Sequence, residues 1–172
     1  YGDKSMSGAY RSIGINRNDF MSLIQMRPEG GAAFGTLEWV AYASNAFNTM
    51  VPFYADVDET PEYLANTTGE VSTENFYWTS RMIAAMADAS YGKSLFHVEH
   101  YQENVLAKSH ALINQYDALL VDEKDPEKQM ELKRKANRKV AEMVQKEASA
   151  TLKKVLYELS NQMKNSYARS DV

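Results

Sequence analysis

The chain has 172 residues, of which 44% are hydrophobic and 24% charged, so it is long enough for one domain with a buried core. Its net charge of -4 gives no reason to expect nucleic acid, and no run of about 18 apolar residues indicates a membrane span. The absence of cysteine excludes a disulfide framework, a thiolate metal site and a thiol nucleophile. We expect a cytoplasmic protein without a nucleic-acid or membrane partner.

The N-terminal segment, residues 1–9, is small and polar, and we expect it to be loose. It lacks both an initiator methionine and the pattern of a signal peptide. We therefore expect the chain to be a fragment of a longer protein.

The first third of the chain has the pattern of β-strands. Tyr10–Asn16 alternates imperfectly between polar and apolar residues, whereas Phe20–Met26 is apolar enough for a strand buried on both faces. Two further strands are expected at Leu37–Tyr42 and Val51–Val57. Pro52 has no backbone donor, so the second of these is either an edge strand or is interrupted at the proline. The short connections indicate antiparallel pairing.

The remaining chain has the pattern of helices. Thr60-Pro61-Glu62 predicts a helix start with Thr60 as the N-cap and Pro61 in the first turn. A longer helix is expected from Ser72 or Thr73 to about Tyr91, ended by Gly92.

Two helices with apolar stripes follow. One begins near Ser94 and ends before Asp125, and the next begins at Asp125-Pro126-Glu127 and keeps helical spacing almost to the C-terminus. Roughly 40 residues would span about 60 Å. Because this exceeds what a domain of this size buries along its length, we expect the last helix to bend or to continue onto another chain.

These patterns predict an α+β fold with antiparallel strands followed by three helices, the last of them long. The expected division is a loose start, a strand-rich part and a helical part, at residues 1–9, 10–63 and 73–170.

Histidine and glutamate gather at the start of the second long helix. His97 and His100 are three residues apart and share a helix face, but the H-E-x-x-H spacing of zinc peptidases is absent and His110 lies almost three turns away. We interpret this cluster, which also contains Glu99 and Glu103, as a helical histidine pair and expect neither a metal nor a cofactor.

A basic run in the last helix is interleaved with acidic residues at spacings of three and four. We interpret it as a solvated, ion-paired face. The residues are Lys133, Arg134, Lys135, Arg138 and Lys139 with Glu127, Glu131 and Glu142.

Arginines and asparagines of the strand-rich part are the remaining polar candidates. Arg11, Arg17 and Arg27 lie in or at the ends of apolar strands, where a charge needs a partner. Asn45 and Asn48 lie between two strands, where they either form the turn or donate to a developing oxyanion. On residues alone, no catalytic constellation is visible.

Several blocks resemble, in order and spacing, the C-terminal half of bacterial dipeptidase A-type enzymes. These are cysteine peptidases of the N-terminal nucleophile hydrolase class, related more distantly to secernins, bile-salt hydrolases and penicillin V acylases. The resemblance covers the chain to about residue 120, and its blocks are Tyr10–Arg17, Leu23–Pro28, Asn45–Asn48, Val51–Val57 and Asn75–Trp78.

This resemblance implies a four-layer αββα sandwich and a mechanism in which an N-terminal cysteine attacks the dipeptide carbonyl with its own α-amine as base. The chain departs from that pattern because it contains no cysteine. The nucleophile must therefore lie on another part of the protein, and we expect the chain alone to hydrolyse nothing.

The resemblance leaves only supporting roles for this chain. Arg11 or Arg17 would stand near the nucleophile, Asn45 or Asn48 would line the substrate pocket, and Asp56 or Asp58 would pair with the α-amine of the substrate. The implied partners are a dipeptide, the N-terminal half of the enzyme and further copies in a homo-oligomer. Two alternatives remain open: an assembly module built on the long helix, and a hydrolase of another amide.

Overall fold

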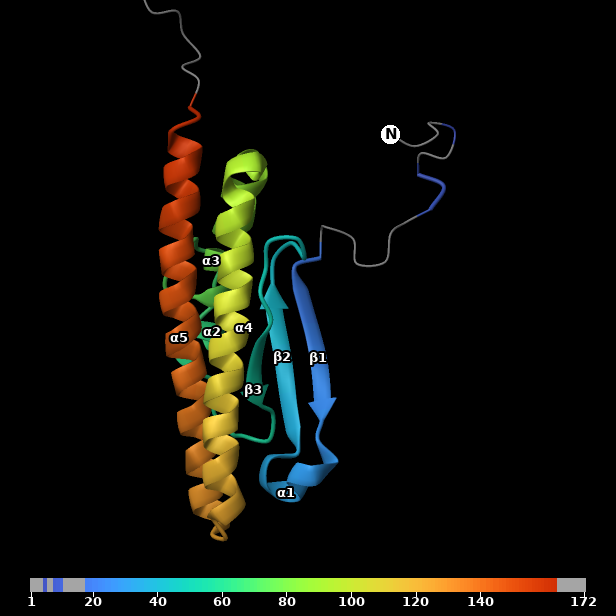
Figure 1. Ribbon diagram of the computed structural model, residues 1–172, viewed down its shortest axis with the longest axis vertical. Helices are drawn as coiled ribbons and strands as arrows, with labels where there is room; N and C mark the ends of the chain where they lie inside the picture. The colour runs from blue at the N-terminus through green and yellow to red at the C-terminus, as the bar shows by residue number, and fades with distance from the viewer. Residues whose placement is uncertain (1–4, 6–7, 11–17, 164–172) are drawn as a thin grey trace, which may run out of the picture.

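Three strands pair in chain order, and two long helices run side by side next to the last strand (Figure 1). The computed structural model describes residues 5, 8–10 and 18–163. The strands are β1 (Phe20–Met26), β2 (Thr36–Tyr42) and β3 (Val51–Tyr54). A 3₁₀ turn spans Pro28–Gly30. The helices are α1 (Gly31–Phe34), α2 (Glu62–Ala65), α3 (Phe76–Ala89), α4 (Tyr91–Asp122) and α5 (Pro126–Ser160).

Both strand pairs are antiparallel, which confirms the predicted pairing and the α+β class. Trp39 in β2 lies opposite Leu23 of β1 and opposite Pro52 of β3. β3 is an edge strand, as its proline predicts, because a residue without a backbone N–H cannot pair on both sides. The described residues form this one sheet, and the second sheet of a four-layer sandwich stays a prediction.

The outer edge of β3 is closed by a side chain. The amide of Asn137 in α5 accepts a hydrogen bond from the backbone N–H of Tyr54 at 2.8 Å and donates one to its carbonyl at 3.0 Å. A neighbouring strand would make this same pair of bonds. Asn137 is 2% exposed, so both bonds lie in the interior and fix α5 against the sheet.

Tyr54 also joins the sheet to α4. Its hydroxyl donates to Asp117 at 2.7 Å, and Asp117 in turn binds Arg27, at the end of β1, at 2.6 Å. Arg27 also donates to the carbonyl of Phe34 and lies against the Phe34 ring. This confirms that Arg27 at the end of an apolar strand needs a partner. Burial and the Asp117 carboxylate raise the pKa of Tyr54, so the hydroxyl stays protonated.

The strand predictions need two corrections. β1 is not buried on both faces: among its residues only Met21 is even half-buried, because β2 is its neighbour in the sheet and the long helices pack against β2 and β3 instead (Figure 1). β3 ends at Tyr54 rather than at Val57, because the acidic residues that follow turn towards cations of α5. The strand predicted at Tyr10–Asn16 lies, apart from Tyr10, outside the described residues.

The predicted start of α5 is confirmed, whereas that of α2 differs by one residue. Asp125 caps α5 by accepting from Glu127 N at 3.0 Å, with Pro126 in the first turn, as predicted. In α2 the N-cap is Pro61 rather than Thr60, and no side chain caps it.

α3 begins later than predicted, because Asn75 rather than Ser72 or Thr73 provides the cap by accepting from Trp78 N at 2.8 Å. Ser72 instead accepts from the N–H of Glu74 within the preceding loop. α3 also ends earlier, at Ala89. Gly92 does not stop it, because this glycine already belongs to the first turn of α4.

The long helix α5 packs against a second long helix of the same chain. It has 35 residues, about 52 Å at 1.5 Å per residue, and α4 with 32 residues runs alongside it (Figure 1). Buried residues recur along α5 from Lys133 to Val155. The predicted bend, or continuation onto another chain, is therefore not required, because a second helix of nearly equal length packs against α5. Within the described residues, neither helix has an apolar stretch that could cross a bilayer.

Replacing Asn137 tests how strongly the side-chain amide holds the sheet edge. Asn137→Ala leaves a buried N–H and a buried C=O without partners, so we expect the free energy of unfolding to fall by about 2 to 4 kcal/mol. Urea unfolding followed by circular dichroism measures this. Lys135→Ala, on an exposed position of the same helix turn, is the control and should change stability by about 0.5 kcal/mol or less. Equal effects of the two substitutions would contradict the role of Asn137.

Candidate functional site

The chain reverses direction after β2 in a tight turn from Ala43 to Asn48. The backbone N–H groups of Phe47 and Asn48 both donate to the carbonyl of Ser44 at 3.0 Å. Ala43 has a φ of 67°, which is uncommon for a residue with a Cβ. Its N–H donates to the carbonyl of Asp19 at 3.0 Å, so the turn is tied to the start of β1. Strain of this kind is often kept at functional positions.

The two asparagines of the turn differ in their surroundings. Asn48 is 6% exposed, and its side-chain amide donates to the carbonyl of Ala43 at 3.0 Å. Its own carbonyl accepts from Gln102 of α4 at 2.8 Å. Asn48 therefore holds the turn in place. The side-chain oxygen of Asn45, in contrast, is buried and has no partner among the described residues, an arrangement that proteins rarely leave unused.

A cavity of about 650 Å³ opens beside this turn. We call it the turn pocket. Its walls are the turn itself, Asp19 at the start of β1, and one side of α3 with the beginning of α4. The turn contributes Ala43, Ser44, Ala46 and Phe47, and the helices contribute Arg81, Ala84, Ala85, Asp88 and Tyr91.

The turn pocket carries charges of both signs. The guanidinium of Arg81 donates to Asp19 at 3.1 Å and to the hydroxyl of Tyr77 at 2.8 Å, and it lies over the rings of Tyr77 and Trp78. Asp88 makes no ion pair or hydrogen bond with any described residue. Neither Arg81 nor Asp88 is among the residues that the sequence pattern predicts for a site. Their signal was two opposite charges seven residues apart in a helix, which is two turns and therefore one face.

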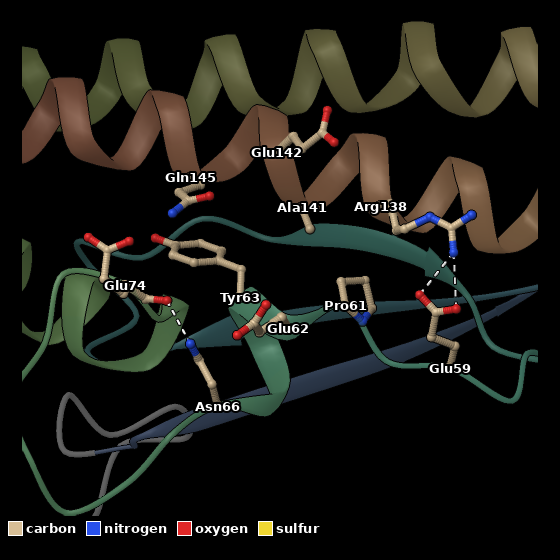
Figure 2. A pocket seen from close by; sticks show the side chains of 10 residues that line it. All are labelled: Glu59, Pro61, Glu62, Tyr63, Asn66, Glu74, Arg138, Ala141, Glu142 and Gln145. Carbon is tan, nitrogen blue, oxygen red and sulfur yellow. Dashed lines mark hydrogen bonds and ion pairs between the residues drawn. The ribbon is translucent and has the colours of Figure 1, made fainter.

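A second cavity, of about 610 Å³, lies between α2, α3 and α5 (Figure 2). We call it the acidic pocket, because four glutamates line it: Glu59, Glu62, Glu74 and Glu142. Arg138 spans one side and binds Glu59 at 3.0 Å. Figure 2 shows the Tyr63 hydroxyl directed towards Glu74 and Gln145. Burial raises the pKa of Tyr63 to about 12, so this hydroxyl is neutral at physiological pH.

The structure separates the predicted substrate carboxylates from the turn pocket. Asp56 and Asp58 follow the far end of β3, whereas Asn48 precedes its near end. Lys133 binds Asp56 at 2.5 Å, and Arg134 holds Asp58 with two bonds of 2.7 and 2.6 Å. A role for Asp56 or Asp58 in substrate binding stays a prediction, and each carboxylate would have to serve a substrate while bound to α5.

The basic run of α5 is ion-paired, as predicted, but with more partners than expected. Glu131 binds Arg134 and Arg138, and Glu142 binds Lys139 at 2.6 Å. The additional partners come from the loop after β3, which helical spacing alone does not reveal: Asp56, Asp58 and Glu59.

The three histidines contact three different partners. His97 lies 3.4 Å from Glu158 of α5, His100 lies against the ring of Phe96, and His110 lies against Trp39 of β2. In the part of the chain that the structure describes, no three potential ligands converge on one point. Arg11 and Arg17, the predicted neighbours of a nucleophile, lie outside the described residues.

Comparison with known proteins gives a consistent family. A sequence model described as peptidase family C69 matches residues 1–104. A probable dipeptidase A of Streptococcus pyogenes serotype M18 is 39% identical over 162 residues, which are 94% of this chain and 33% of that protein. A dipeptidase of Bifidobacterium longum is 34% identical over 208 aligned positions, which cover 99% of this chain and 39% of that protein. The chain thus spans about a third of the length of these relatives.

The ion pair between Asp58 and Arg134 predicts a pH dependence of stability. The hydrogen bond from Arg134 lowers the pKa of Asp58 below that of an unfolded chain, which is about 4. The pair therefore stabilises the fold above that pH, and its contribution is lost as the pH falls through the lower, folded pKa. We expect the stabilities of the wild type and Asp58→Asn to differ at pH 6 and to converge as the pH falls through the lowered pKa of Asp58.

Urea unfolding between pH 3 and pH 7 measures this difference. Glu70→Gln is the control, because Glu70 forms no ion pair with a described residue. A constant difference between the wild type and Asp58→Asn across the whole range would show that the ion pair is not its source.

Proposed function

This chain belongs to peptidase family C69, and from that premise we propose that it supplies part of a dipeptidase. In this proposal it contributes the sheet, the two long helices and one wall of the substrate pocket. The cysteine nucleophile, absent from this sequence, lies on another part of the polypeptide. The substrate is a dipeptide, and the product is a pair of free amino acids.

The observation that carries the proposal is the extent of the family match. Residues 1–104 include all three strands, the turn after β2, all of α3 and the beginning of α4. These are the elements that line the turn pocket. The relatives that align with nearly the whole chain bear the names of dipeptidases.

The reaction divides between the two parts of such an enzyme. The α-amine of the terminal cysteine takes the proton of its own thiol, and the thiolate so formed attacks the carbonyl carbon of the dipeptide. The peptide C–N bond then breaks, and the α-ammonium group returns the proton to the nitrogen of the leaving amino acid. Water then releases the acyl group. This chain would help to stabilise the oxyanion, a role that needs a fixed donor close to the developing charge.

Asn45 suits that role better than Asn48. The amide of Asn48 is already bound to Ala43 within the turn, whereas the side chain of Asn45 has a buried oxygen without a partner. A side-chain amide has both a donor and an acceptor end, and their assignment depends on the groups around it. We therefore assign the oxyanion role to Asn45 and the structural role to Asn48. Arg17 remains the proposed arginine near the nucleophile, with Arg11 as the alternative.

We also propose that the protein forms a homo-oligomer and is located in the cytoplasm. The assembly-module alternative stays open, because α4 packs along α5 while Leu156 and Tyr157 near the end of α5 are exposed. Hydrolysis of another amide within the same enzyme class remains an alternative substrate.

The isolated chain should be inactive. We expect the purified 172-residue polypeptide to release no free alanine from Ala-Ala above a heat-denatured sample, because it has no thiol. The natural polypeptide that carries this sequence should hydrolyse the same dipeptide and lose that activity after alkylation with iodoacetamide. Turnover by the isolated chain, or full resistance of the longer protein to alkylation, would disprove the proposed division of labour.

Substitutions in the longer protein separate the two asparagines. Asn45→Ala should lower kcat and kcat/KM together by about 10²- to 10³-fold, as the loss of an oxyanion donor does. Arg17→Ala should lower both as well. Asn48→Ala should instead lower the melting temperature, because it removes a buried bond that holds the turn. Unchanged kinetics for Asn45→Ala and Arg17→Ala would remove both residues from the site.

A further inference from the structure

The turn pocket is charged at two points and apolar between them. Arg81 and Asp88 both project from α3, and Ala84 and Ala85 lie between them on the same helix. Phe47 of the turn lines the same pocket and belongs to the buried cluster that contains Ala84. A zwitterion with small side chains has the complementary pattern, with one negative end, one positive end and an apolar middle.

The spacing of the two charges suits a short peptide. Seven residues of helix separate their Cα atoms by about 10 Å along the axis. The Arg81 guanidinium lies over Tyr77 and Trp78, earlier in α3, so its charge is farther from Asp88 than the Cα spacing. An extended dipeptide spans about 7 Å, and a hydrogen bond of about 3 Å at each end brings the total to about 13 Å.

Both charged groups keep unused bonding capacity. A guanidinium has five N–H donors. Among the described residues, those that bind Arg81 engage only its Nη1, at Asp19 and Tyr77, which leaves Nη2 and Nε for a ligand. Nη2 and Nε together form the fork that binds a carboxylate with two parallel bonds. Asp88 has no described partner at all, so its carboxylate can accept from an ammonium group.

We propose that the turn pocket binds both charged ends of the dipeptide, with Arg81 holding the terminal carboxylate and Asp88 holding the α-ammonium group. This inference rests on the proposed dipeptidase function and deepens it. Asp19 then has a positioning role, because its bond to Nη1 holds the guanidinium at the wall of the pocket. The scissile bond lies over the alanine strip, on the side of the pocket that Ala43, Ser44 and Ala46 line. A tripeptide, about 3.5 Å longer, does not fit between the two charges.

Three substrates with the natural, longer polypeptide test the proposal. They are Ala-Ala, its C-terminal amide, which lacks the negative end, and propionyl-alanine, which lacks the positive end. We expect the wild type to prefer Ala-Ala over each analogue by at least about 10-fold in kcat/KM. Arg81→Gln should lower kcat/KM for Ala-Ala by about 10- to 100-fold and leave the rate with the amide within about threefold. Arg81→Lys should recover part of the loss.

Asp88→Asn should remove the recognition of the α-ammonium group and leave that of the terminal carboxylate. The preference for Ala-Ala over propionyl-alanine should disappear, and the preference over the amide should remain. Lys128→Gln and Glu70→Gln are matched controls that change one positive and one negative surface charge outside the pocket. Both should leave all three rates unchanged.

Each remaining outcome counts against a stated claim. Equal losses on all three substrates with Arg81→Gln would show a structural role and overturn the proposal, as would unchanged selectivity in both variants. Failure of the wild type to hydrolyse Ala-Ala would instead overturn the dipeptidase function itself, and the inference would fall with it.

Discussion

Tyr54 is the residue on which the arrangement of the sheet and the helices depends. It is 1% exposed, and its backbone is held by Asn137 of α5 while its hydroxyl is held by Asp117 of α4. Through Asp117 the same cluster reaches Arg27 at the end of β1. Buried polar groups are costly when a partner is missing, so these bonds permit only one position of the sheet along the helix pair. The apolar clusters on either side of β2 and β3 then pack in a fixed register.

Local sequence signals predicted the elements well and their limits less well. The edge position of Pro52 and the Asp125 cap of α5 follow from single-residue chemistry, and both are confirmed. Ser72, Thr73 and Asn75 are all competent caps, and only the packing of Phe76, which is fully buried, decides in favour of Asn75. Gly92 resembles a helix stop, but the change of direction occurs at Ser90. Such choices depend on tertiary contacts that no local window contains.

The candidate site was predictable only in part. The family resemblance and the turn chemistry directed attention to Asn45 and Asn48, and the pocket lies beside their turn. Arg81 and Asp88 carry no motif, because two opposite charges on an exposed helix face are common on any protein surface. They line a pocket only because the fold places the turn and the start of β1 opposite them. Asp56 and Asp58 were candidates from the sequence, but their ion-pair partners Lys133 and Arg134 could not be predicted, because they lie 77 and 76 residues away in the chain.

The amide of Asn137 also determines how this sheet can grow. With the outer edge of β3 occupied by a side chain of α5, no further strand can join on that side without displacing the helix. β1 is the opposite margin, and its apolar residues Phe20, Leu23 and Ile24 are about half exposed. A strand added to this sheet by another segment must therefore join at β1. An exposed apolar strand is also the place where separate molecules adhere to one another. The chain thus carries an aggregation hazard that is concentrated at one margin of the sheet.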